Sequence, residues 1–161
     1  MYKVWDVVIY KRDVCKIQNI KEAGSGTRYY IMNPIDDLSL TIKIPVDGTF
    51  SLRYAITKEE VQDLISKIPS IETIEVADRD IEYEYKKLLA DNSLESLIKI
   101  IKTTYLRNQM RIQQKKRVGE KDDYYLKRAE KRLYNELSVS LQLSFEETKQ
   151  YVVDSVQALL A

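Results

Sequence analysis

The sequence contains no histidine and only one cysteine, Cys15, among its 161 residues. Histidine is the commonest general base and the commonest transition-metal ligand, and one cysteine can form neither an internal disulfide nor a structural zinc site. Without an imidazole to activate it, Cys15 is expected to be a structural thiol. These absences exclude the most frequent kinds of catalytic site, so we predict a protein that is not an enzyme and that needs no metal or cofactor.

Long apolar runs are also missing. No stretch approaches the roughly 20 apolar residues that span a bilayer, and the N-terminus lacks the basic-then-apolar pattern of a signal peptide. Phosphate-binding loops, dinucleotide-binding fingerprints and nucleophile elbows are absent as well. Because 44% of the residues are hydrophobic, the chain can still bury a core. We therefore expect a soluble cytoplasmic protein with no membrane partner and no small-molecule substrate.

The net charge of +1 hides an uneven distribution. Residues 1–70 carry 10 basic and 9 acidic side chains, residues 71–98 carry 3 and 8, residues 99–135 carry 12 and 4, and residues 136–161 carry 1 and 4. The third segment therefore has a net charge of +8, from 12 minus 4. A basic segment of this kind is typical of surfaces that bind polyanions.

The first 56 residues contain four short β-type stretches separated by turn-forming residues. In residues 40–44 the apolar side chains alternate with Thr41 and Lys43, which indicates a strand with one buried and one exposed face. The pattern predicts a small, strongly bent antiparallel sheet or barrel. Its predicted strands are 4–10, 15–20, 28–32 and 40–44.

After residue 56 the apolar period changes from two to about three and a half, which predicts helices. Thr57 with Glu60, and Ser144 with Glu147, form the capping-box pattern that begins a helix. The fold class is therefore α+β in two parts: a β domain at 1–56, and a bundle of four to five α-helices at 57–161. The helices between the two capped ones are predicted at 83–90, 94–116 and 122–141, the second with an apolar stripe through Leu97, Ile98 and Tyr105.

Three basic residues, Arg107, Arg111 and Lys115, follow one another at four-residue spacing on the predicted helix 94–116. Clustered cations of this kind neutralise backbone phosphates and release counterions. The alternative is an ordinary solvated helix face, in which Asp123 or Glu130 pairs with Lys127 at helical spacing. The full set of candidate DNA-binding residues is Lys99, Lys102, Arg107, Arg111, Lys115, Lys116, Arg117 and Lys121.

Four carboxylates, Asp78, Asp80, Glu82 and Glu84, lie close together in the acidic segment. Paired acids can hold a metal ion or act as acid–base partners. In a helix these side chains fan out, so the interpretation favoured here is a solvated helix start with mutually repelling charges and no metal site. The twelve tyrosines are interpreted in the same way, as half-buried packing residues rather than stacking platforms.

The chain opens with MYKVWDVVIY, continues with LTIKIPV at 40–46 and LRYAITKEE at 52–60, and carries LKRAEKRLYNEL at 126–137 and SFEET at 144–148. These segments, in this order, resemble the CarD/CdnL family of bacterial transcription factors. The resemblance implies a Tudor-like β domain that binds the RNA polymerase β subunit. It also implies a helical domain that contacts promoter DNA at the upstream edge of the bubble and stabilises the open complex without reading sequence.

The resemblance also implies where polymerase binds. The contact is expected on the exposed side of the strand at 40–44, where Lys43 stands in place of the family's arginine and Thr41 is its neighbour. Lys21 lies near another basic position of the family and is a further candidate.

One departure from the family pattern concerns the DNA contact. The family carries a tryptophan that wedges into the minor groove at the start of its second domain, whereas this chain has Asp78, Arg79, Asp80 and Ile81 there. Carboxylates at that position repel phosphates. Two functions therefore stay open: a regulator that holds polymerase and promoter DNA together, and a polymerase-binding adaptor that acts only through protein–protein contacts.

Overall fold

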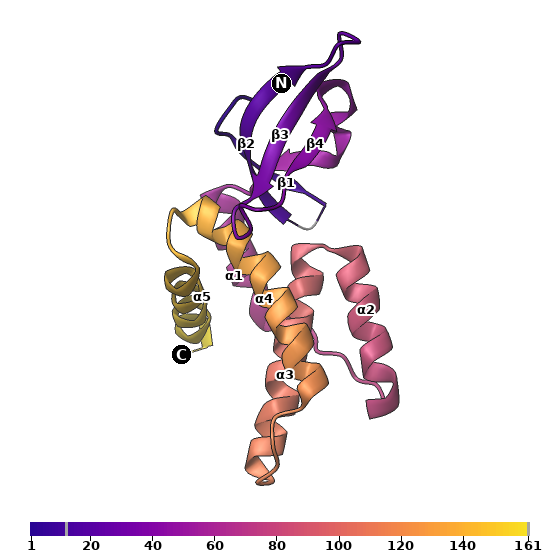
Figure 1. Ribbon diagram of the computed structural model, residues 1–161. Helices are drawn as coiled ribbons and strands as arrows, with labels where there is room; N and C mark the ends of the chain where they lie inside the picture. The colour runs from indigo at the N-terminus through magenta and orange to yellow at the C-terminus, as the bar shows by residue number, and fades with distance from the viewer. Residues whose placement is uncertain (12, 161) are drawn as a thin grey trace. The chain divides into compact units, whose positions relative to one another are not determined.

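The computed structural model of the protein describes residues 1–11 and 13–160, with the backbone alone for residues 49–51. The chain divides into two compact units, Met1–Ile56 and Thr57–Ala161, and the division coincides with the change of apolar period in the sequence. The first unit contains the sheet and the second contains the α-helices (Figure 1).

The first unit is a five-stranded antiparallel sheet in the order β4-β3-β2-β1-β5. Strands β1 to β4 follow one another as a meander, and β5 returns to pair with the free side of β1. Among the described residues β4 and β5 do not pair, so the sheet is not closed into a barrel. The strands are β1 Val7–Tyr10, β2 Asp13–Glu22, β3 Arg28–Pro34, β4 Ile42–Pro45 and β5 Leu52–Tyr54, with a 3-10 segment, η1, at Val46–Ser51.

One face of the sheet forms the core of the first unit. Alternation along β3 buries Tyr30 and Met32 completely, while Tyr29 and Ile31 point to the opposite face. The buried face also contains residues from the other strands, and Cys15 is among them, as expected for a structural thiol. The buried cluster is Val8, Cys15, Ile17, Tyr30, Met32, Ile44 and Leu52.

The first and last strands differ from the predicted ones. The first begins at Val7 rather than at residue 4, because Trp5 has a φ of +76° and interrupts the extended backbone. The strand β5 was not predicted, since three residues leading into a helix show no alternation. Its place in the sheet depends on pairing with β1, which lies more than 40 residues away in the sequence.

Among its described residues the second unit contains five α-helices, in agreement with the four to five that the apolar period predicts. Both predicted capping boxes are confirmed: the Thr57 hydroxyl accepts from the Glu60 N–H and the Ser144 hydroxyl accepts from the Glu147 N–H, each at 3.1 Å. The helices are α1 Lys58–Lys67, α2 Ile81–Asp91, α3 Leu94–Gln113, α4 Glu120–Leu141 and α5 Phe145–Leu160, with 3-10 turns η2 Ile68–Ser70 and η3 Asp78–Asp80. In the described part of the chain, no helix has the length and apolarity to cross a membrane.

Helices α3 and α4 form a hairpin that makes the most extensive helix contact of this unit (Figure 1). Along α4 the residues at four-residue spacing, Tyr125, Ala129, Leu133 and Leu137, are all buried. The predicted α3 stripe is buried only in its first half, since Tyr105 is 63% exposed. Helix α3 also ends three residues earlier than predicted, at Gln113. The last turns of the hairpin therefore expose more of α3 than the sequence pattern suggested.

Candidate functional site

The most buried charged group of the helical unit is the carboxylate of Asp122, whose side chain is 1% exposed. Asp122 lies in the first turn of α4, facing α2 and α3. The Tyr85 hydroxyl of α2 donates to its Oδ1 at 2.7 Å, and the Arg107 Nε of α3 donates to its Oδ2 at 3.1 Å. The Arg111 guanidinium, one turn further along α3, also pairs with it. Three helices are therefore joined through one carboxylate.

The two arginines extend this network to neighbouring segments. Arg107 also pairs with Asp78 of η3, with 2.9 Å between Nη1 and Oδ1, and Arg111 donates to Asn108 Oδ1 at 2.8 Å. The Gly119 N–H, at the start of α4, donates to the same oxygen of Asn108 at 3.2 Å. A Cβ on Gly119 would lie 2.5 Å from Arg111 Nη1, so only glycine allows the turn to approach the guanidinium this closely.

The electrostatics of the network follow from its burial and charges. Burial by itself raises the pKa of Asp122, but the hydrogen bonds from Arg111, Tyr85 and Arg107 outweigh it, so the pKa lies below its ordinary value. Burial and the hydrogen bond to Asp122 raise the pKa of the Tyr85 hydroxyl. The carboxylate is therefore ionised and the phenol neutral, which is the arrangement of a structural ion network.

This placement changes the interpretation of the predicted DNA-binding set. Arg107 and Arg111 are largely covered and paired with carboxylates inside the protein. The Lys102 ammonium donates to the backbone oxygens of Ile68 and Ile71, at 2.6 Å each, and burial lowers its pKa. These three cations hold the unit together, an outcome that neither the DNA-binding interpretation nor the solvated-face alternative anticipated.

Lys121 and Lys127 are exposed but paired with carboxylates. Lys121 lies 3.2 Å from Glu82 of α2, and the predicted pair of Lys127 with Asp123 is present at 2.9 Å. Glu130, the other candidate partner of Lys127, pairs with Lys149 instead. Exposed pairs of this kind are weak and leave the lysines accessible to other anions.

Three exposed cations, Lys115, Lys116 and Arg117, have no carboxylate partner among the described residues. They follow one another in the turn that joins α3 to α4, which we call the basic turn. Lys115 has a φ of +59°, the left-handed conformation that ends α3 and reverses the chain. Of the predicted DNA-binding residues, these form the one accessible cluster in the described part of the chain.

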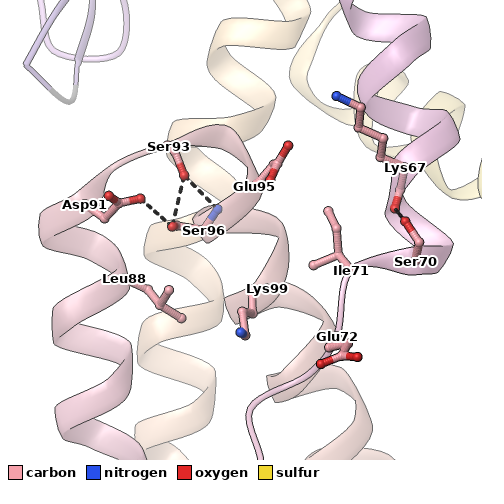
Figure 2. A pocket seen from close by; sticks show the side chains of 10 residues that line it. All are labelled: Lys67, Ser70, Ile71, Glu72, Leu88, Asp91, Ser93, Glu95, Ser96 and Lys99. Carbon is pink, nitrogen blue, oxygen red and sulfur yellow. Dashed lines mark hydrogen bonds between the residues drawn. The ribbon is translucent and has the colours of Figure 1, made fainter.

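Lys99 lies elsewhere, in a cleft of about 590 Å³ between the end of α1 and the α2–α3 hairpin (Figure 2). Its position is 16 residues from Lys115, or about 24 Å along an α-helix. Glu72, Glu95 and Asp91 line the same cleft, and Asp91 accepts a hydrogen bond from Ser96 at 2.6 Å. Carboxylates on both walls make this cleft unfavourable for a polyanion.

The predicted polymerase-binding residues all lie exposed in the first unit. Lys43 is in the edge strand β4, and its ammonium lies 4.5 Å from the centroid of the Tyr29 ring. Lys21 of β2 is the register partner of Tyr29, and Lys43 is the partner of Ile31, so these side chains share the outer face of the sheet. Thr41 is exposed just before β4 begins. We call this surface the outer sheet face.

The carboxylates of residues 78–84 were interpreted as a helix start with mutually repelling charges, but the structure pairs them with cations. Asp78 pairs with Arg107, and Glu84 pairs with Lys87 at 3.3 Å. Glu82 lies 3.3 Å from Lys86 as well as near Lys121, and these two lysines lower its pKa. The carboxylates therefore act as partners for nearby cations.

The functional role that the sequence did not reveal is that of Asp122. The one hint in the sequence is that Asp122 is an acidic residue within a strongly basic segment. This hint does not single it out, because aspartate is common in the first turn of a helix. Only the approach of α2, α3 and α4 makes it a buried partner for two arginines.

Comparison of the chain with protein-family models and with curated proteins finds no significant match.

Proposed function

We propose that the protein is a transcription regulator that binds the RNA polymerase β subunit through the outer sheet face and promoter DNA through the basic turn. The observation that carries the proposal is the accessibility of Lys43 on an edge strand, beside Tyr29 and Lys21. A cation held over an aromatic ring presents both charge and apolar area to a partner protein. The resemblance to the CarD/CdnL family supports the identity of that partner.

A Tudor-like fold is part of the same proposal. The strand order supports it, because β5 returns to pair with β1 beside the meander of β1 to β4. The apolar side chains of one face are buried within the unit, and Lys43 and Lys21 lie on the other face.

The DNA contact is assigned to Lys115, Lys116 and Arg117. Three phosphate contacts give a salt slope of about −2.7, from three times −0.9 per contact on duplex DNA. Such binding is weak alone and insensitive to sequence, because phosphates carry no base information. Tethering through polymerase raises the local concentration of promoter DNA and makes a weak contact sufficient.

The mechanism is a shift of equilibrium. A protein that holds polymerase and upstream DNA together favours the open complex to the extent that it binds this state more tightly than the closed one. The open-complex lifetime is therefore the quantity to measure. We expect it to increase with protein concentration, and no change at saturation would refute the regulator hypothesis.

Two charge-reversal variants separate the two contacts. Lys43→Glu should abolish capture by the purified polymerase β-subunit lobe, whereas Lys3→Glu, an equal charge change elsewhere in the same unit, should not. A triple Lys115→Glu, Lys116→Glu, Arg117→Glu variant should keep polymerase binding and shorten the open-complex lifetime. Equal capture of the Lys43 and Lys3 variants would refute the assignment of the outer sheet face.

The adaptor hypothesis is retained as a second candidate because of two observations. Arg107 and Arg111 are committed to Asp122, and acidic residues occupy the position of the family's tryptophan wedge. If the protein acts only through protein–protein contacts, the triple glutamate variant will keep the full effect on the open complex.

A further inference from the structure

The turn before β1 carries the single tryptophan of the chain, Trp5, which is 62% exposed. The Asp6 N–H donates to the Lys3 carbonyl oxygen at 3.0 Å, which closes a four-residue turn with Trp5 in the third place. Trp5 has a φ of +76°, in the left-handed region where a Cβ is unfavourable and glycine is preferred. The chain therefore holds a large apolar side chain at its surface in a strained backbone conformation.

Hydrogen bonds on both sides hold this turn in place. The Trp5 N–H donates to the Ile17 carbonyl oxygen of β2 at 2.7 Å, and the Ile17 N–H donates to the Asp6 carbonyl oxygen at 2.9 Å. The Asp6 Oδ2 accepts from the Lys3 N–H and from the Tyr54 hydroxyl of β5, each at 2.9 Å. The strands β2 and β5 therefore fix the backbone of the turn, and with it the direction of the indole.

The contact that the indole makes within the protein offsets little of this strain. The Lys16 ammonium lies 5.2 Å from the centroid of the Trp5 ring, and an exposed cation–π contact is weak. Strained residues persist where the surrounding structure imposes them, and they cluster at sites that contact ligands. Tryptophan is also among the residues most enriched in the dominant contacts of protein interfaces. Both observations point to a partner that covers Trp5.

Lys16 connects Trp5 to the outer sheet face. Its two neighbours along β2 are buried, so alternation places Lys16 on the outer side of the sheet. Its register partner is Asn33, two residues along β3 from Ile31, and Ile31 is the register partner of Lys43. Two strand spacings of about 4.8 Å and two residues of about 3.4 Å therefore separate the two lysines, which is about 12 Å. An ordinary interface covers about 800 Å² on each partner, so one partner can span Trp5 and Lys43 together.

The charges of this surface specify the partner. In the strands β2, β3 and β4, all of whose residues the structure describes, the outward-facing positions carry three lysines, Lys16, Lys21 and Lys43, and no carboxylate. The acid beside Trp5 in the sequence, Asp6, is hydrogen-bonded within the turn. A complementary surface must therefore place carboxylates around an apolar pocket.

We propose that Trp5 anchors the polymerase contact by inserting its indole into an apolar pocket of the RNA polymerase β subunit whose rim carries carboxylates. The indole supplies a large, rigid apolar area, while Lys16 and Lys43 face the carboxylates of the rim. This inference rests on the proposed function and adds to it the residue on which the affinity for polymerase mainly depends.

Single-stranded DNA fits this surface less well. Bases stack on the faces of aromatic rings, and proteins that bind single strands present several such platforms in succession. Here the Lys16 ammonium lies over the Trp5 ring, and the Lys43 ammonium lies over the Tyr29 ring at 4.5 Å. Each ring therefore offers at most one face to a base.

Titration of the full-length protein with the purified polymerase β-subunit lobe tests the anchor. Trp5→Gly should weaken binding at least about tenfold, the loss expected for a dominant interface residue. The urea midpoint of this variant should be unchanged or higher, because glycine adopts a positive φ without strain, so a folding defect will not explain the loss. Tyr83→Ala is the matched control and should keep the wild-type affinity, since Tyr83 of α2 is 67% exposed and also has a lysine, Lys87, 5.5 Å from its ring centroid.

A second measurement follows the indole directly. Because the chain has one tryptophan, incorporation of a fluorinated tryptophan gives a single fluorine NMR resonance, that of Trp5. This resonance should shift when the unlabelled lobe is added, and it should stay unchanged when single-stranded DNA of mixed sequence is added.

Three outcomes would overturn the proposal: equal affinity of wild type and Trp5→Gly, equal losses in Trp5→Gly and Tyr83→Ala, or a resonance that responds to single-stranded DNA and not to the lobe. If Lys43→Glu abolishes lobe binding and Trp5→Gly keeps it, the anchor assignment fails and the proposed function stands. If the wild type does not bind the lobe, both fail.

Discussion

Replacing the carboxylate of Asp122 by an amide tests the ion network of the helical unit. The Asp122→Asn variant keeps the size of the side chain but removes the charge that Arg107 and Arg111 share. Removing one partner of a buried ion pair costs about 3–5 kcal/mol. The two arginine side chains are 20% and 26% exposed and recover part of their hydration, so we expect a loss of about 2–4 kcal/mol.

Urea denaturation followed by far-ultraviolet circular dichroism measures this loss, because all five α-helices lie in Thr57–Ala161. With an m-value of roughly 2 kcal/mol/M, the urea midpoint should fall by about 1–2 M. Asp123→Asn is the matched control, since the neighbouring pair with Lys127 is exposed and contributes about 0.3–0.5 kcal/mol. Equal midpoints for the two variants would refute the reasoning.

The same network predicts a pH dependence. The hydrogen bonds from Arg111, Tyr85 and Arg107 outweigh the effect of burial and lower the pKa of Asp122 in the folded protein. The unfolded chain therefore binds the proton more readily, with a pKa of about 3.9. The stabilisation is complete above that pH and is lost as the pH falls through the lower pKa of the folded state. The difference in urea midpoint between wild type and Asp122→Asn should shrink below about pH 4, and a constant difference would contradict the assignment.

Three further predictions test local features. Gly119→Ala should destabilise the protein by about 1–3 kcal/mol in urea denaturation, since the added methyl group displaces the Arg111 guanidinium; an unchanged midpoint would exclude the close approach. Burial, with nearby acidic residues, raises the pKa of Cys15 to about 12, so a thiol reagent at pH 8 should label it only as fast as the protein unfolds. Thr57→Ala should cost about 1 kcal/mol through loss of the α1 cap, and Thr57→Ser, which keeps the hydroxyl, should restore most of it.

Local chemistry made much of the fold predictable. Thr57 and Ser144 cap their helices through hydrogen bonds to residues three positions away, which the sequence shows directly. The buried positions of α4 follow from a four-residue period, and those of β3 from alternation. Each of these features depends on neighbours within one turn or one strand.

The candidate site was predictable only in part. The accessible cations of the basic turn and the exposed Lys43 agree with what the sequence suggests about solvent-facing positions. The roles of Arg107 and Arg111 were not predictable, because their partners Asp122 and Asp78 lie 11 to 29 residues away on other elements. Helical spacing alone placed both arginines in one row with Lys115.

The sequence by itself determined the two-part division, the helices and the first four strands, and the absence of histidine chemistry, since these follow from composition and short-range periodicity. The tertiary structure decided which cations are internal and which are available, and which apolar side chains of α3 remain exposed. The physical reason is that charge and hydrophobicity belong to single residues, whereas pairing and burial depend on which distant segments come within a few ångströms of each other.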